Sequence, residues 1–318
     1  MFTISNSSSN GFEMIHLTDT ATKTTAAILP LCGATLHTFS VVHNQGMLNI
    51  IDHYENAADF AENVTAKGFK SCKMSPFACR IKNAAYQYNG NSYTIEKFLL
   101  GSSAIHGLLY DAPFILVNST ADENHASITL QHQYIGTDKG YPFNYTCAVT
   151  YQLKPNNELV ITTTVTNDDE QALPLQDGWH PYFCFGGKVD DLLLEFQSTT
   201  HVVFDETLIP TGEMEAYDDF SSIKKIGTAS FDDCYQLNFE TCQPMCVLKD
   251  PVKNIGVEIR PDKSYPYLQI YTPPHRQSIA IENLSAPPDS FNNGINLIIL
   301  NPGEVINFTT SYTITHTK

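Results

Sequence analysis

Two residues suited to acid–base chemistry stand inside short apolar segments of this sequence. His180 lies in Gly178-Trp-His-Pro-Tyr-Phe183, and Glu282 lies in Ile279-Ala-Ile-Glu-Asn-Leu284. A buried imidazole or carboxyl group requires a hydrogen-bonding partner or a chemical task. Each residue alone has a structural alternative: a core histidine that donates to a backbone carbonyl, or a surface carboxylate on the outer face of an edge strand. Together they are candidates for general acid–base catalysis, in which each positioned group contributes about 10²–10⁴-fold.

The elements around these candidates are predicted to be β-strands. Apolar residues alternate from Tyr145 to Leu153, and the alternation resumes from Leu159 to Val165 after the interruption at 154–157. This pattern predicts a β-hairpin. Near the end of the sequence the apolar run Ile295–Leu300 meets a turn at 301–304 and continues at period two to Ile314, which predicts a second hairpin whose last strand is tied into a sheet.

Short strand candidates fill the remaining sequence at intervals of about ten residues, for example Leu192–Phe196 and Leu268–Tyr271. Such spacing favours an all-β sandwich or barrel. The best helix candidate is Glu55–Asn63, where Ala57, Phe60 and Ala61 would share one face, and we expect it to be a surface connection. No linker, repeat or shift of charge divides the chain, so we expect one domain over residues 1–318.

The charge balance excludes two classes of partner. The chain has 34 acidic and 18 basic side chains, for a net charge of -16, which repels nucleic acid and anionic membrane surfaces. Its first twenty residues carry no secretory signal, and no run approaches the roughly 20 apolar residues that cross a bilayer. We therefore expect a cytoplasmic protein that acts on a small molecule. The sequence leaves its oligomeric state open.

Further motifs follow one another in a single order along the chain. They are Cys79-Arg80-Ile81, Ile105-His106-Gly107, the His180 segment, Phe231-Asp-Asp-Cys-Tyr235, Leu268-Gln-Ile-Tyr-Thr-Pro273 and the Glu282 segment. In this order they resemble the aldose 1-epimerase (galactose mutarotase-like) family, over about Pro76 to Asn293. The specific parts are Gly-Trp-His-Pro-Tyr-Phe, and Leu-Gln-Ile-Tyr-Thr-Pro followed by Ile-Ala-Ile-Glu.

The resemblance implies a large antiparallel β-sandwich with an open sugar-binding cleft, and interconversion of the α and β anomers of a free aldose. It implies roles for six matching residues: Glu282 as catalytic base, His180 as catalytic acid, and His106, Arg80, Asp232 and Gln269 as substrate-binding groups. Asp232 is preferred to Asp233 because the family's aspartate usually lies three residues before an aromatic residue, here Tyr235.

The reaction requires no cofactor and no metal, because it consists of two proton transfers and a bond rotation. Glu282 must be ionised while His180 must be able to donate a proton. We expect the positive charge of Arg80 to favour the ionised carboxylate, and a carboxylate partner to favour the protonated imidazole.

The chain departs from the family pattern at two motifs. Cys79 stands where Asn is common, and Leu108 stands where a second Gly usually follows His-Gly. A tryptophan often found after His-Gly is missing, and the only tryptophan here is Trp179. We therefore expect the sugar-stacking surface and the substrate preference to differ from the family's usual ones.

Four alternatives remain. A metal site of His106, His180 and a carboxylate lacks the spacing of known motifs, since the chain has no His-x-x-x-His and no Cys-x-x-Cys pair. A glycoside hydrolase with Glu282 and Asp232 would leave both histidines unused. A hexose-6-phosphate epimerase would need more cations than Arg80, from among Arg260, Lys263 and Arg276. A non-catalytic sugar-binding protein on the same fold is the fourth.

Overall fold

The computed structural model describes residues 1–241 and 243–316. Its largest sheet has nine antiparallel strands, and their spatial order is β12 (Ile115–Ala121), β13 (Ala126–Ile135), β14 (Asn144–Lys154), β15 (Glu158–Asn167), β29 (Val305–His316), β25 (Ile255–Pro261), β24 (Cys246–Asp250), β19 (Leu193–Phe196) and β22 (Lys224–Lys225). The predicted hairpin is confirmed, because β14 pairs with β15 along its whole length.

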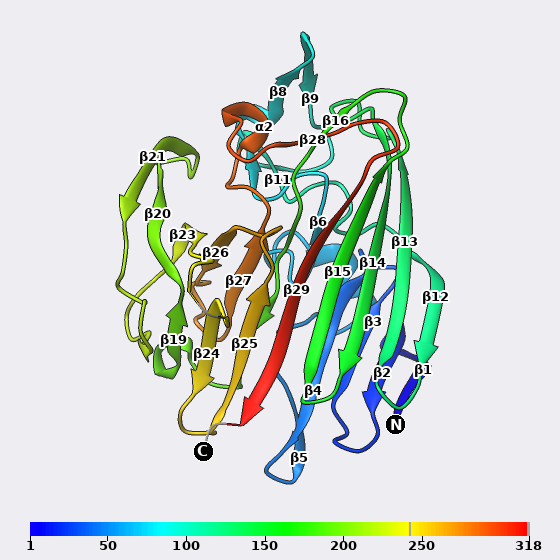
Figure 1. The fold of residues 1–318 in the computed structure, drawn as a ribbon, viewed down its shortest axis with the longest axis vertical. Helices are drawn as coiled ribbons and strands as arrows, with labels where there is room; N and C mark the ends of the chain where they lie inside the picture. Colours follow the sequence, from blue (N-terminus) through cyan, green and yellow to red (C-terminus); the bar gives the residue numbers. More distant parts are fainter. Residues whose placement is uncertain (242, 317–318) are drawn as a thin grey trace.

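Two further large sheets complete the sandwich. One consists of β1 (Phe2–Ser9), β2 (Phe12–Asp19), β3 (Thr25–Leu29), β4 (Thr35–His43) and β5 (Gly46–Asn49) in sequence order. The other is ordered β21 (Pro210–Ala216), β20 (Ser198–Phe204), β23 (Asp232–Leu237), β26 (Tyr267–Tyr271), β27 (Ile279–Leu284), β17 (Gly178–Trp179) and β6 (Lys73–Met74), with β18 (Tyr182–Phe183) also paired to β27. Figure 1 shows the first beside the β12–β14 half of the nine-stranded sheet and the second beside its β24–β25 half.

Short elements connect these sheets. They are β7 (Arg80–Ile81), β11 (Ser103–Ile105) and β10 (Leu99–Leu100) in one small sheet, the pairs β8 (Ala85–Tyr88) with β9 (Asn91–Thr94) and β16 (Leu173–Leu175) with β28 (Ile298–Leu300), the helices α1 (Ala57–Asn63) and α2 (Ser290–Asn293), and 3₁₀ turns at Lys82–Ala84 and Val189–Asp191. None of the helices in the described ranges is long and apolar enough to cross a membrane.

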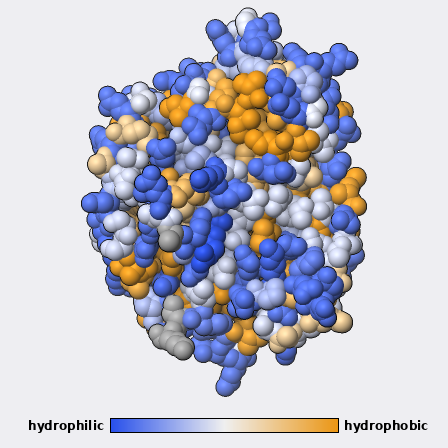
Figure 2. Space-filling model, in the orientation of Figure 1, coloured by the Kyte–Doolittle hydropathy of each residue, from blue (hydrophilic) through white to orange (hydrophobic). Residues whose placement is uncertain are grey.

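The larger of two apolar cores lies between the sheets and confirms the all-β sandwich. It joins Leu17 and Phe39 of the five-stranded sheet, Tyr145 and Ile161 of the nine-stranded sheet, and Leu268 of the eight-stranded sheet. Side chains alternate between core and solvent along the strands. The face in Figure 2 is accordingly mostly hydrophilic, with hydrophobic atoms in separate patches.

Two predicted elements differ in detail. The helix begins at Ala57, after the side chain of Asn56 accepts the N–H of Asp59, and of its expected apolar face only Phe60 is buried while Ala61 is exposed. In the apolar run 295–300, only Ile298–Leu300 forms a strand. That strand pairs with β16 because both edges of β29 are already paired, with β15 and β25.

Candidate active site

Strand register places His180 beside Glu282. In the pairing of β17 with β27, Trp179 lies opposite Asn283. Because the strands are antiparallel, the residue after Trp179 falls opposite the residue before Asn283. Nε2 of His180 lies 3.3 Å from Oε1 of Glu282, and both side chains are almost fully buried. Strand β27 is an inner strand of its sheet, so the alternative of a surface carboxylate on an edge strand is wrong for Glu282.

Glu282 also has a neighbour on the other side of β27, in strand β26. Gln269 of β26 lies directly opposite Glu282, and its amide nitrogen donates to Oδ1 of Asp232 at 3.2 Å. Asp232 stands at the start of β23, opposite Tyr271. Successive side chains of a strand point to opposite faces of the sheet. Asp232 therefore lies on the same face as His180, Glu282 and Gln269, and Asp233 lies on the other face.

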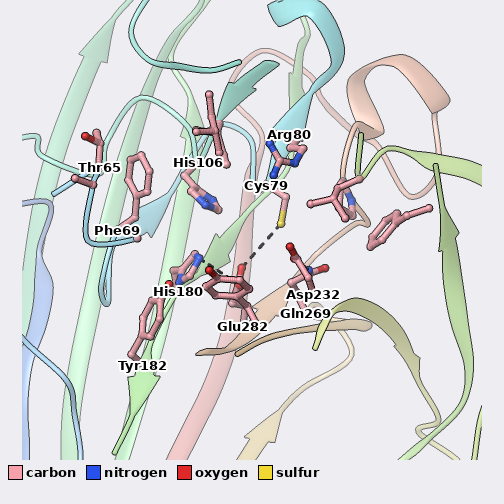
Figure 3. Close-up of a pocket in the computed structure, with 18 residues that line it drawn as sticks. Thr65, Phe69, Cys79, Arg80, His106, His180, Tyr182, Asp232, Gln269 and Glu282 are labelled. Atoms are coloured by element: carbon pink, nitrogen blue, oxygen red, sulfur yellow. Dashed lines mark hydrogen bonds and ion pairs between the residues drawn. The ribbon is translucent and has the colours of Figure 1, made fainter. Parts of the chain in front are cut away.

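Cys79, Arg80 and His106 close the site from above this sheet (Figure 3). Cys79 and His106 both have left-handed backbones, with φ of 52° and 60°, and the N–H of His106 donates to the carbonyl of Cys79 at 2.9 Å. Gly107 follows with φ of 78°, and a Cβ there would lie 2.4 Å from the carbonyl oxygen of Ser75. The His-Gly motif therefore places an imidazole over the sheet where only glycine fits next.

These elements enclose a cavity of about 370 Å³. All six residues singled out from the sequence line it: Glu282, His180, His106, Arg80, Asp232 and Gln269. Other lining residues are aromatic or aliphatic, among them Phe69, Leu100, Ile105, Tyr182, Phe204, Leu208 and Tyr271. A volume of this size lies in the range of small-molecule sites, which combine mostly apolar walls with a few convergent polar groups.

The imidazole of His180 is held by rings rather than by a backbone carbonyl. It lies parallel to the ring of Tyr182, and the ring of His106 meets it edge-on at 4.7 Å between centroids. Its Nδ1 is buried without a hydrogen-bond partner within the described residues. The structural alternative, a core histidine donating to a carbonyl, is therefore wrong.

Burial dominates the electrostatics of the pair. It raises the pKa of Glu282 well above its usual value, and the negative charge of Asp232 raises it further, while the thiol of Cys79 near Oε2 opposes the shift. Burial also lowers the pKa of His180 to about 4. The free site therefore favours an uncharged carboxyl and an uncharged imidazole, which hold one acidic proton between them.

The expectation that the charge of Arg80 keeps the carboxyl group of Glu282 ionised is thus wrong. The guanidinium lowers the pKa of Asp232, though burial keeps that pKa above its usual value. Burial, then electrostatic coupling to His180 and the positive charge of Arg80, keep the pKa of His106 well below its usual value. Desolvation outweighs charge pairing because these groups lie in the interior of the sandwich.

The aromatic residues that line the cavity were not predicted from the sequence. Tyr182 lies two residues after His180, and this spacing in a strand could have indicated that both share a face. Tyr271 has the same spacing from Gln269 in the predicted strand Leu268–Tyr271, whereas Phe69 left no comparable signal. Trp179, which directly precedes His180 in the sequence, points away from the cavity into the core, where it packs against Tyr151.

Solved structures share this fold. A galactose mutarotase-like protein from Clostridium acetobutylicum superimposes with a TM-score of 0.85 at 17% identity, over 99% of both chains. Galactose 1-epimerase from Lactobacillus acidophilus gives 0.81 at 19% identity, over 100% of this chain and 99% of that one. Fold and cavity together define a galactose mutarotase-like β-sandwich protein.

Sequence comparison identifies the family. The family model for aldose 1-epimerase matches residues 14–313, and the chain belongs to this family. An aldose 1-epimerase of Streptococcus thermophilus is 25% identical over 87% of each chain. An uncharacterized protein of Escherichia coli K12, YihR, is 29% identical over 73% of this chain and 74% of its own.

Proposed function

We propose that this protein is an aldose 1-epimerase, which interconverts the α and β anomers of an unphosphorylated aldose. The observation that carries the proposal is the 3.3 Å contact between His180 and Glu282 in the wall of the cavity. The anomeric hydroxyl and the ring oxygen of a sugar are bonded to the same carbon. An acid and a base that act on both must therefore be close neighbours.

The single proton of the pair supports a closed cycle. In the tautomer in which the shared proton has moved from the carboxyl group to the imidazole, Glu282 takes the proton of the anomeric hydroxyl while His180 gives its proton to the ring oxygen. The bond between C1 and the ring oxygen breaks, and the open-chain aldehyde rotates about C1–C2. On reclosure His180 takes back the proton of the ring hydroxyl and Glu282 returns its own to the carbonyl oxygen, so the pair ends with the proton count with which it began.

The other polar groups serve orientation. Oε1 of Gln269 is buried with no hydrogen-bond partner in the described part of the chain, so a sugar hydroxyl that donates to it removes an unsatisfied acceptor. Arg80, Asp232 and His106 are the remaining groups that hold hydroxyls in place. Their contribution is to fix the geometry in which the two proton transfers occur.

The charge of the lining favours a neutral sugar over a hexose 6-phosphate. Among the described lining residues Arg80 is the only Lys or Arg, against the two carboxyl groups of Asp232 and Glu282. Of the three candidate cations outside the motifs, Arg276 pairs with Asp190 and Arg260 with Glu258, while the exposed Lys263 does not line the cavity. A phosphate would require several such groups around it.

Saturation-transfer NMR of anomer exchange tests the proposal. Glucose, galactose, other aldoses and hexose 6-phosphates are compared with and without the protein, and with Glu282→Gln and His180→Gln as matched variants. We expect at least one neutral aldose to exchange faster than in buffer, with a loss of about 10²-fold or more in either variant. Calorimetric sugar binding with exchange at the buffer rate would instead indicate the non-catalytic alternative.

A further inference from the structure

A buried polar network lies beneath the sheet that carries the site. It consists of Lys73, Asp177 and Tyr265, whose side chains are fully buried. Nζ of Lys73 donates to Oδ1 of Asp177 at 2.5 Å and to the carbonyl of Gly178 at 3.0 Å. The hydroxyl of Tyr265 donates to the same Oδ1 at 2.7 Å. We call these three residues the Lys73–Asp177–Tyr265 network.

Stability alone does not account for this network. Burial raises the pKa of the Asp177 carboxyl despite its two donors, and its second oxygen is buried without a partner in the described chain. The removal of two charges from water costs free energy, and the attraction between the charges seldom exceeds this cost. Apolar side chains of similar volume often stabilise a fold at least as well as a buried ion pair does. A buried ion pair of this kind is best explained by what it holds in place.

The network ties together four strands of the eight-stranded sheet. Lys73 is in β6, Asp177 directly precedes β17, and Tyr265 stands two residues before β26. Asp177 also meets the end of β27, since its N–H donates to Oγ of Ser285 and its carbonyl accepts the N–H of Ser285, both at 2.9 Å. These strands carry or adjoin His180, Gln269 and Glu282.

The segment 71–74, whose last two residues form β6, in turn contacts both histidines of the site. The N–H of His180 donates to the carbonyl of Cys72 at 3.2 Å, and the carbonyl of His180 accepts the N–H of Ser71 at 2.8 Å. The sulfur of Met74 lies 3.1 Å from Nδ1 of His106. Lys73, between Cys72 and Met74, therefore anchors the segment that holds the backbone of His180 and contacts the imidazole of His106.

We propose that the Lys73–Asp177–Tyr265 network positions His180 and His106 relative to Glu282, and that its members are positioning residues for the acid–base reaction. This inference rests on the proposed function for its kinetic readout. Its structural content, the orientation and proton affinity of the two imidazoles, is measurable without turnover.

The main test replaces both charges at once. The double variant Lys73→Met with Asp177→Leu leaves no unpaired buried charge, so we expect it to fold. We expect kcat for anomer exchange to fall about 10- to 100-fold with KM within about threefold, and the ¹⁵N resonances and titration midpoint of the His180 imidazole to shift. A purely structural network predicts unchanged kcat and unchanged imidazole spectra in the folded variant, and that result overturns the inference.

A milder variant covers the case in which the double variant does not fold. Tyr265→Phe removes only the hydroxyl that binds Asp177, and we expect a loss of kcat of about threefold with a displaced imidazole resonance. Tyr141→Phe is the matched control, because it removes a buried hydroxyl that donates to the carbonyl of Pro174 at 2.8 Å, outside the network. Equal spectra and rates in the two single variants contradict the inference.

The proposed epimerase activity and the positioning role of the network can be refuted independently of each other. A wild-type protein with no exchange on any sugar refutes the proposed function, while shifted imidazole resonances in the network variants would still support the positioning role. A wild-type protein that is active, with network variants equal to it in kcat and in imidazole spectra, refutes the positioning role alone.

Discussion

The imidazole of His180 lies nearly parallel to the phenol ring of Tyr182, with 5.0 Å between ring centroids and 15° between the planes. The two residues belong to the interrupted strand β17–β18, whose two parts pair with the same partner, β27. The ring of Tyr182 therefore limits the rotation of the imidazole.

Removal of this ring should impair catalysis more than sugar binding. We expect Tyr182→Ala to lower kcat about 10- to 100-fold, because an imidazole displaced by about 1 Å loses its alignment. Tyr182→Phe retains the stacked ring and should stay within about threefold of wild type. Anomer exchange and calorimetric sugar affinity measure both effects, and equal kcat in the two variants would refute this role for the stacking.

The pH dependence of activity should be bell-shaped and set by the shared proton. Below about pH 4 His180 binds a second proton, so the pair lacks a base; above the raised pKa of Glu282 the pair has lost its proton and lacks an acid. We expect kcat/KM to fall only below about pH 4 on the acid side, well under the usual range of histidine. An acid limb near pH 6.5 would contradict the shift.

The replacement of Asp232 tests the origin of the alkaline limb of the pH profile. Its negative charge raises the pKa of Glu282, so Asp232→Asn should lower that pKa and move the alkaline limb to lower pH. Asp233→Asn is the matched control, one residue along on the other face of β23, and should leave the limb in place. The position of the limb in a kcat/KM profile is independent of any change in absolute rate.

Glu282 should also make the fold less stable at neutral and alkaline pH. The folded protein keeps this proton to a higher pH than the unfolded chain, where the carboxyl titrates near 4.5, so the free energy of unfolding falls as pH rises above 4.5 towards the folded pKa. Each pKa unit corresponds to about 1.4 kcal/mol, or roughly 2–4 °C in Tm. We expect Glu282→Gln to melt above wild type at pH 8, with a difference that vanishes near pH 4.

Calorimetry between pH 4 and pH 8 measures this effect. Glu240→Gln, at an exposed turn, is the control and should have wild-type Tm throughout. A Tm difference for Glu282→Gln that does not change with pH would show that the carboxyl is not held protonated by burial.

Gln269 should act on binding. Its unpartnered Oε1 requires a donor, and one hydrogen bond contributes about 0.5–1.5 kcal/mol. We expect Gln269→Leu to raise KM about tenfold and to change kcat by less than threefold. Steady-state exchange kinetics at several sugar concentrations separate the two parameters, and a loss confined to kcat would place Gln269 in the reaction instead.

Sequence reasoning succeeded where structure is local. The hairpin of β14 and β15, for example, follows from alternation around one turn. Six of the residues that line the cavity were singled out in another way, by the resemblance of their motifs to a family. The direction of the pKa shifts was not accessible, because burial of Glu282 depends on long-range pairing of β27 with β26, β17 and β18. The network beneath the sheet left no sequence signal, since Lys73 and Asp177 are 104 positions apart.

Strand β29 follows every other strand of the described chain, yet it lies between β15 and β25 in the middle of the nine-stranded sheet. During synthesis the sheet is therefore divided until residues 305–316 emerge, and β15 and β25 each present an open edge. Contacts between such distant segments slow folding, and exposed edges recruit other chains. A nascent chain of this protein therefore exposes two sheet edges that are open to aggregation until its central strand is synthesised.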